Sequence, residues 1–296
     1  MDVEPAPSRT GQQRVRISRV QGTTAGSAFD EVAREDALQL MVDSLPLAIM
    51  LRTPGSDLEL ALGLLHAEGV VAKVAEIASV RIAPSGQRDL HFPQLELELD
   101  PEAENLVDVK LRAPLPDGGL GWQRALPSSS ACGICGAATL EALQRFQPPV
   151  EGDFVWPIER IFHLPEMLAE SQRVFSTTGG LHAAGLLSWE GSPMMVAEDV
   201  GRHNAVDKLV GRALAEGRLP LTNSAMVVSG RAGFEIVQKA AAAQVAVVAS
   251  ISAPSSLAVQ TAELLGVTLI GFLRGERCNV YSRPDRVGLP GGPGAG

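Results

Sequence analysis

Cysteine is scarce in this sequence, which contains three in 296 residues. Three cysteines are too few for the disulfide framework of a small secreted domain, and two of them, Cys132 and Cys135, form a C-x-x-C pair. In a reducing compartment such a pair serves redox, metal or thiol chemistry rather than structural crosslinking. The scarcity of cysteine therefore directs the search for function to this one pair of thiols.

Long hydrophobic runs are also missing. The longest one, residues 240–249, is interrupted by Gln244 and is too short to span a bilayer. The first 13 residues are polar and contain proline, without the apolar segment of a secretory signal. We therefore expect a cytoplasmic protein that does not enter the membrane.

Basic residues are outnumbered. The chain has 25 Lys and Arg against 34 Asp and Glu, which gives a net charge of −9. This balance disfavours nonspecific binding to nucleic acid or to a membrane surface. An acidic chain that binds an anionic small molecule must instead gather its arginines at one place.

The first half of the chain predicts a mixture of strands and helices. Alternating apolar residues indicate strands over residues 15–20, 95–99 and 106–111, the last two suited to antiparallel pairing, and residues 47–51 are a continuous apolar strand. Ser56 and Glu59 form the pattern of a capping box, which predicts a helix from residue 57 to about residue 68, stopped by Gly69. A Pro/Gly/Ser-rich loop over residues 113–130 and a helix over residues 137–146 follow.

The second half alternates regularly between strands and helices. The predicted strands are residues 194–197, 225–229, 245–251 and 267–273, and the predicted helices are residues 202–216, 232–243 and 255–265. Such a βαβ series predicts an α/β fold with a parallel or mostly parallel sheet flanked by helices. The predicted units are a disordered tail (1–13), an N-terminal α+β domain (14–130), a C-x-x-C loop with a connecting helix (131–150), a C-terminal α/β domain (151–286) and a second disordered tail (287–296).

The C-x-x-C pair is the sharpest chemical signal. Glycines beside Cys132 and Cys135 allow a tight turn, and the helix predicted after them points free N–H groups at the sulfurs, which favours a reactive thiolate. A packed loop without chemistry, a zinc half-site and a thioredoxin-like couple remain alternatives. Zinc normally needs a second pair of ligands, and the chain offers only Cys278 and five scattered histidines.

His182 follows a loop of two threonines and two glycines that allows close approach of the backbone. It is either a proton donor or ligand, or a hydrogen-bonded core histidine. A zinc nucleobase deaminase would place Glu two residues after such a histidine and a C-x-x-C segment later in the chain. Here Ala184 stands at that position and the C-x-x-C pair comes earlier, so deaminase chemistry is disfavoured.

A charged stretch at a strand-to-helix junction contains Asp199, Arg202, His203, Asp207 and Lys208. Ligands of α/β proteins bind at such junctions, which makes this stretch a candidate site. In the alternative interpretation, Asp199 caps the helix, and Asp207 and Lys208 lie on a solvated face.

Three further loops follow predicted strands. Residues 229–235, with Arg231, and residues 252–256 suit anion binding by backbone N–H groups, although neither is a Walker loop nor a dinucleotide fingerprint. In the third loop, Arg274 and Arg277 could bind phosphate while Phe272 stacks on a base. Surface ion pairs with Glu276 are the alternative for these two arginines.

Six segments in this order resemble the formate dehydrogenase accessory sulfurtransferase family: C-G-I-C-G, T-G-G-L-H-A-A, E-D-V-G-R-H-N-A-V-D-K, S-G-R-A-G-F-E, S-A-P-S-S-L-A and G-F-L-R-G-E-R. The resemblance covers residues 14–286. It implies a protein that accepts persulfide sulfur from a pyridoxal-phosphate cysteine desulfurase. The sulfur then passes to the molybdenum of a bis(molybdopterin guanine dinucleotide) cofactor, before that cofactor enters formate dehydrogenase.

The same resemblance implies roles for individual residues. Cys132 would carry the persulfide and Cys135 would assist it. The cofactor, which a guanine nucleotide would mimic, would contact Phe272, Leu273, Arg274, Gly275, Glu276 and Arg277, and we add Arg202, His203, Arg231 and His182 to this site. Lys208 belongs to the same set of available cations.

The resemblance further implies a three-layer C-terminal domain similar to cytidine deaminases, homodimers and no structural zinc. Cys278 has no role in the family pattern and is expected to be a small core residue. A cofactor-binding chaperone without sulfur chemistry is the alternative function.

Overall fold

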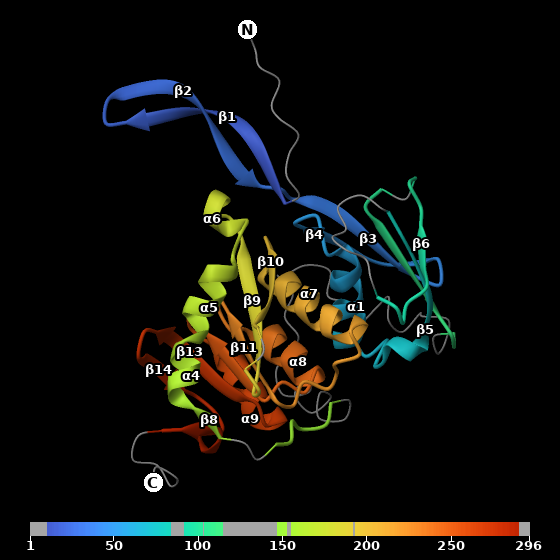
Figure 1. Ribbon diagram of the computed structural model, residues 1–296, viewed down its shortest axis with the longest axis vertical. Helices are drawn as coiled ribbons and strands as arrows, with labels where there is room; N and C mark the ends of the chain where they lie inside the picture. Colours follow the sequence, from blue (N-terminus) through green and yellow to red (C-terminus); the bar gives the residue numbers. More distant parts are fainter. Residues whose placement is uncertain are drawn as a thin grey trace.

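The computed structural model describes residues 11–83, 92–102, 104–114, 147–152, 155–191 and 193–289, arranged around two hydrophobic cores (Figure 1). One core lies mainly between residues 38 and 109 and also includes Leu214 and Ala215. The other lies between Val150 and Val287. The pair Cys132 and Cys135, the loop from residue 115 and the helix predicted over residues 137–146 lie outside the described residues.

The larger core is built on a six-stranded sheet. In spatial order its strands are β10 (Met195–Asp199), β9 (His182–Ser188), β11 (Ser224–Val228), β12 (Val247–Ser250), β13 (Thr268–Arg274) and β14 (Arg277–Val280). The central strands β11, β12 and β13 are parallel, whereas β9 runs antiparallel to both of its neighbours and β14 runs antiparallel to β13. The four strands that the sequence predicts, β10, β11, β12 and β13, therefore run in one direction, as expected. Strands β9 and β14 run against them, because short hairpin connections at both edges reverse the chain.

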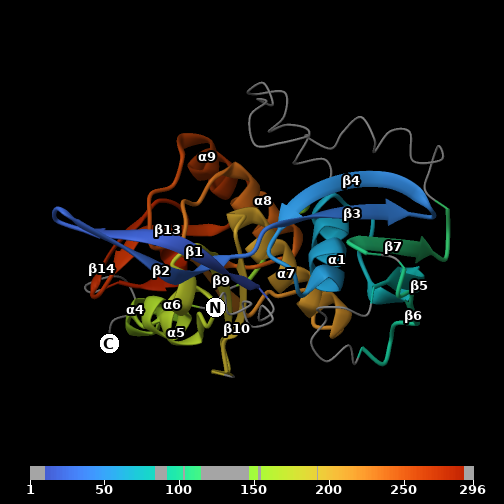
Figure 2. The ribbon, with the colours of Figure 1, turned by 90° about the horizontal axis from the view of Figure 1, so that it is seen from above.

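Helices cover both faces of this sheet, which gives three layers (Figures 1 and 2). On one face lie α4 (Ile158–Phe162) and α5 (Leu164–Ser171), followed by the short α6 (Phe175–Thr178). On the other lie α7 (Arg202–Ala215), α8 (Phe234–Ala242) and α9 (Ser256–Leu265), within one or two residues of their predicted bounds. The short strands β8 (Trp156–Pro157) and β15 (Val287–Gly288) pair beside the sheet, with the 3-10 turn η3 (Pro284–Arg286) before β15. The likeness to cytidine deaminases stays a prediction.

The smaller core lies under a five-stranded sheet. Its order is β4 (Leu45–Arg52), β3 (Asp36–Val42), β7 (Leu106–Leu111), β5 (Ile77–Ile82) and β6 (Leu97–Leu99), with the 3-10 turn η1 (Val74–Glu76) before β5. Strand β7 is antiparallel to β5 but parallel to β3, and β6 is parallel to β5. The two strands predicted to suit antiparallel pairing, β6 and β7, run in opposite directions but do not pair with each other, because β5 lies between them.

Helix α1 (Asp57–Ala67) ends before Gly69, as predicted, but its start differs from the predicted capping box. Ser56 has a φ of 58° and its side chain caps nothing. The first turn is instead held by Asp57, whose carboxylate accepts two hydrogen bonds from Arg52, at 3.0 and 2.8 Å. An ion pair with the preceding strand therefore replaces the expected side-chain cap.

A hairpin arm of β1 (Gln12–Gln21) and β2 (Thr24–Ala33) projects from the body (Figure 1). The sequence predicts a half-buried strand at residues 15–20 but does not predict β2. Both strands are mostly exposed, with Val20 65% and Phe29 45% accessible. The predicted tails are also too long, since β1 begins at Gln12 and β15 extends to Gly288.

The two cores are joined where α1 crosses α7. At this crossing a Cβ atom on Gly63 would overlap the carbonyl oxygen of Asp207, and one on Gly211 would overlap that of Glu59. The backbones of the two helices are therefore in direct contact, which only glycine permits. In the described part of the chain, no helix is long and apolar enough to cross a membrane.

We expect Gly211→Ala to destabilise the protein by about 2 kcal/mol or more, because the added methyl group must force two backbones apart. The gain in helix propensity from alanine, about 1 kcal/mol, offsets only part of this cost. Urea denaturation measures the change. Gly26→Ala in the arm is the control, since a Cβ there meets nothing within 4 Å; equal midpoints for the two variants would contradict the crossing.

Candidate functional site

The structure gathers the predicted ligand residues at one edge of the six-stranded sheet. Asp199 at the end of β10 pairs with His182 at the start of β9, so both lie level with the loop after β11. The next loop is tied to this one through Ser250, whose hydroxyl donates to the carbonyl oxygen of Gly230 at 2.7 Å. Since β11, β12 and β13 are parallel, their carboxyl ends form one continuous edge, which we call the carboxyl edge.

His182 and Arg202 meet over Gly230. A Cβ on Gly230 would lie 3.2 Å from the His182 ring nitrogen and 3.5 Å from the Cβ of Arg202. The Ser229 hydroxyl accepts from the Ala183 N–H at 2.9 Å and lies 3.5 Å from His182 Nδ1. Burial, followed by the nearby Arg202, lowers the pKa of His182, so this ring is predominantly neutral at pH 7 and can donate one hydrogen bond and accept another.

His203 lies in the first turn of α7, and its Nδ1 is 3.3 Å from a carboxylate oxygen of Glu235 on α8. Burial lowers its pKa to about 4, although Glu235 alone would raise it. At neutral pH this contact is therefore a hydrogen bond between a neutral imidazole and a carboxylate, rather than an ion pair. Sequence reasoning did not identify Glu235 as the partner of His203, since the two are 32 residues apart.

Phe272 stands in an unusual backbone conformation at the carboxyl edge. Its φ is 54°, which costs a bulky residue on the order of 1–3 kcal/mol, and such strain clusters at functional sites. A bulge in the pairing of β13 with β14 and a hydrogen bond from the Phe272 N–H to the Ser252 carbonyl at 3.0 Å hold it there. The residue is 45% exposed, so this strained position leaves a large part of an aromatic residue accessible to solvent.

The remaining residues of this hairpin divide between core and surface. Gly275 makes the turn with a φ of 53°, and Glu276 is exposed. Arg274 and Arg277 face each other across the strand pair and are both exposed. Leu273 is fully buried, and its side chain packs in the larger core. Its place in the cofactor-contacting segment stays a prediction.

Four arginines at the carboxyl edge lack a carboxylate partner among the described residues: Arg202, Arg231, Arg274 and Arg277. The alternative of an ion pair with Glu276 is therefore not formed there. The Nε of Arg202 is buried without a hydrogen-bond partner, and Arg274 Nε makes only a long contact of 3.4 Å with the Ile251 carbonyl. The edge therefore carries four positive charges that no carboxylate of the described residues neutralises in an ion pair.

Lys208 does not belong to this set. Its side chain is 3% exposed, and its ammonium is held by Asp199 at 2.7 Å and by the Thr53 carbonyl at 2.8 Å. Asp207 is likewise buried, in an ion pair with Lys239 at 2.7 Å, so the solvated-face interpretation of both residues is wrong. These two buried ion pairs hold segments of the fold together and do not bind a ligand.

Cys278 is half-buried and packs against the larger core, which confirms it as a small core residue. Burial raises the pKa of its thiol, so it is a weak nucleophile. Among the described residues no group of three His, Cys, Asp or Glu side chains is placed to hold a metal ion. The roles of Cys132 and Cys135, and the absence of a structural zinc, stay predictions.

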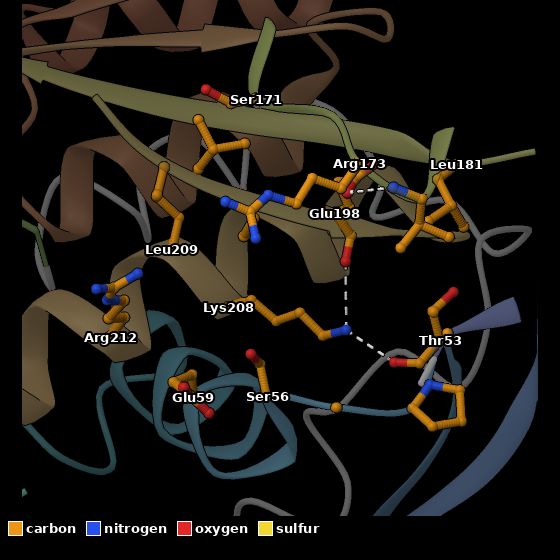
Figure 3. A pocket seen from close by; sticks show the side chains of 16 residues that line it. Thr53, Ser56, Glu59, Ser171, Arg173, Leu181, Glu198, Lys208, Leu209 and Arg212 are labelled. Atoms are coloured by element: carbon orange, nitrogen blue, oxygen red, sulfur yellow. Dashed lines mark hydrogen bonds between the residues drawn. The ribbon is translucent and has the colours of Figure 1, made fainter. Parts of the chain in front are cut away.

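A second polar region, which sequence reasoning missed, lies between α1, α7 and β10 (Figure 3). It contains Glu59 and Arg173, which are far apart in the sequence. No local motif signals it, because its residues come from both halves of the chain.

Comparison with known proteins gives one consistent result. The model of the FdhD/NarQ family matches residues 33–288. A sulfur carrier protein FdhD from Anaeromyxobacter dehalogenans (strain 2CP-1 / ATCC BAA-258) is 47% identical over 279 residues, which cover 90% of this chain and 91% of that protein. One from Streptomyces coelicolor is 42% identical over 291 residues, covering 96% and 98%.

The fold has a solved counterpart. The crystal structure of a protein from Desulfotalea psychrophila, described as a formate dehydrogenase accessory protein, superimposes with a TM-score of 0.70. It covers 93% of this chain and 99% of its own, at 23% sequence identity. At this identity the comparison establishes the shared fold.

We expect the His203 imidazole to titrate near pH 4, because burial opposes its charged form. The unfolded chain takes up the same proton near pH 6.5, so between these values the unfolded state binds more protons. Stability should therefore fall as the pH falls through this window, by up to about 3 kcal/mol. NMR follows the ring directly, and His203→Gln should remove this part of the pH dependence of unfolding; an imidazole titrating above pH 6.5 would contradict the assignment.

Proposed function

Because the chain belongs to the FdhD/NarQ family, we propose that it is a cytoplasmic sulfur carrier that accepts persulfide sulfur from a cysteine desulfurase. It passes the sulfur to the molybdenum of a bis(molybdopterin guanine dinucleotide) cofactor, which is its substrate. The cofactor then enters formate dehydrogenase. The relatives named sulfur carrier protein FdhD and the solved accessory protein support this direction.

The observation that carries the proposal is the carboxyl edge. Its four arginines lack a carboxylate partner among the described residues, and two of them lie in the same hairpin as the exposed, strained Phe272. The proposed substrate carries diphosphate groups and guanine bases. A guanidinium group can donate two parallel hydrogen bonds to phosphate oxygens, and an exposed aromatic ring can stack on a purine. Arg274 and Arg277 follow Phe272 in the same hairpin, so one turn offers both kinds of contact.

The remaining residues of the edge complete the proposed site. Arg202 presents a buried Nε without a partner, and Arg231 follows the loop at Gly230. Neutral His182 and His203 supply hydrogen bonds without adding charge. Clustered cations of this kind let an acidic protein attract a polyanion locally.

The sulfur chemistry is assigned to Cys132. Its thiolate attacks the outer sulfur of a desulfurase persulfide, forming Cys132–S–S and releasing the desulfurase thiolate, so that no net oxidation occurs. Cys135 lies three residues away, where it can relay the sulfur or stabilise the charge on Cys132. The chaperone alternative differs in one respect, since it requires no persulfide on either cysteine.

The hairpin arm supports the proposal of a homodimer. A two-stranded hairpin is marginally stable in water on its own, and this one leaves Val20, Phe29 and Val32 substantially exposed. A second copy of the chain would cover these side chains. The desulfurase and formate dehydrogenase complete the proposed set of partners.

Exchanging both Arg274 and Arg277 for alanine should weaken GDP binding at least about tenfold at low salt, because two charge-assisted contacts are lost. The difference from the native protein should shrink as salt rises, since screening already weakens these contacts. Calorimetric titration measures both effects. The double variant Arg16→Ala/Arg19→Ala removes the same charge from the arm and should leave affinity unchanged; equal losses in the two double variants would place the site elsewhere.

We expect Cys132→Ser to abolish both persulfide formation and formate dehydrogenase activation, while GDP binding and thermal stability stay unchanged. Cys135→Ser should impair activation but still allow the first persulfide to form. Mass spectrometry after incubation with a desulfurase and cysteine locates the added sulfur. Cys278→Ser is the control, because its thiol is half-buried with a raised pKa. Sulfur on neither Cys132 nor Cys135 would favour the chaperone alternative.

A further inference from the structure

A cavity of about 330 Å³ lies where the loop before α1 meets α7, β10 and the segment after α5 (Figure 3). Its lining includes none of the residues assigned to the carboxyl edge. The volume is at the lower limit of small-molecule sites, so it suits a ligand of a few heavy atoms rather than a dinucleotide.

Some of the polar groups around this cavity are already satisfied. The Lys208 ammonium contacts Asp199 and two backbone carbonyls, of Thr53 and Glu198. Both carboxylate oxygens of Glu198 accept backbone N–H groups, from Val174 at 3.0 Å and Phe175 at 2.8 Å. These groups form the rigid walls of the cavity and have little capacity left for a ligand.

Glu59 is the exception on the α1 side. The residue is 8% exposed, and its Oε2 is buried without a hydrogen-bond partner among the described residues. Burial raises the pKa of this carboxyl, against the opposing effect of Lys208 and Arg212. A buried polar atom left unpaired costs about 1–3 kcal/mol, which a ligand that donates a hydrogen bond would recover.

Two arginines face the same space. Arg173 is exposed and has no carboxylate within ion-pair distance in the described part of the chain. Arg212 uses its Nε on Glu216 at 2.8 Å, which leaves its terminal amino groups for another acceptor. Figure 3 shows Arg173 reaching into the cavity from one wall, with Glu59 on the opposite wall and Arg212 to one side.

Groups of opposite character on facing walls restrict the class of ligand. A simple anion would satisfy the guanidinium groups but leave Glu59 Oε2 unpaired and repelled. A simple cation would satisfy Glu59 but meet two arginines. A molecule with an anionic end and a hydrogen-bond-donating cationic end, a few bonds apart, satisfies both walls.

We propose that this cavity binds a free α-amino acid, with its carboxylate on Arg173 and Arg212 and its ammonium group on Glu59. An α-amino acid is small enough for the cavity and leaves space for bound water. The site is separate from the carboxyl edge, so amino-acid binding can be tested independently of the proposed sulfur transfer.

The full chain is first screened by thermal shift against the twenty standard amino acids, and the tightest binder is titrated by calorimetry. The same titration uses its deaminated analogue, which keeps the carboxylate, and inorganic phosphate. The amino acid should bind at least about tenfold more tightly than either. No binding by any amino acid, or equal affinity for the deaminated analogue or phosphate, would overturn the proposal.

Variants then assign the two ends of the ligand. Arg173→Ala should weaken the amino acid and its deaminated analogue alike, whereas Glu59→Gln, which keeps the shape of the side chain, should weaken the amino acid alone. Arg112→Ala is the matched control, an exposed arginine outside the cavity whose side chain donates to the Ala75 carbonyl. Unchanged amino-acid affinity in Glu59→Gln, or an equal loss in Arg112→Ala, would refute the assignment.

Discussion

The buried contact of Lys208 with Asp199 and Thr53 is the interaction on which the rest of the arrangement depends. It joins the loop before α1 to the start of α7, so that one ammonium group fixes elements from both cores. Asp199 also accepts the N–H groups of Thr53 and Gly201, which means that every charged atom has a partner. Removing one partner of such a buried pair leaves the charge of the other uncompensated. An incomplete contact would therefore strongly destabilise the folded protein.

This connection places both candidate sites. The same turn that holds Asp199 continues into Arg202 and His203, so the carboxyl edge begins where the buried contact ends. On the other side, Lys208 lines the cavity that also contains Glu59. A single helix, α7, therefore serves the two sites through its first turn and its middle, and its position relative to α1 determines the shape of the cavity.

Sequence periodicity predicted the helices of the second half well, because α7, α8 and α9 alternate with strands whose apolar runs are buried on both faces. Sequence periodicity failed where the presence or direction of a strand depends on pairing with other segments of the chain. The direction of β9 and β14 depends on hairpin connections, and β2 carries no burial pattern because the arm has no core beneath it. Arginine clustering was predictable from loops at strand ends, whereas the burial of Lys208 was not, since its partners are a backbone carbonyl and a carboxylate that folding brings together.

The crossing of α1 and α7 has an evolutionary consequence. At Gly63 and Gly211 the contact consists of backbone atoms, so every substitution can only add atoms to a space that holds none. Side-chain interfaces can drift through compensating exchanges of large and small residues, but this one has no side chain to exchange. Descendants of this sequence can keep the crossing or lose it, and no gradual path leads to a different angle between the two cores.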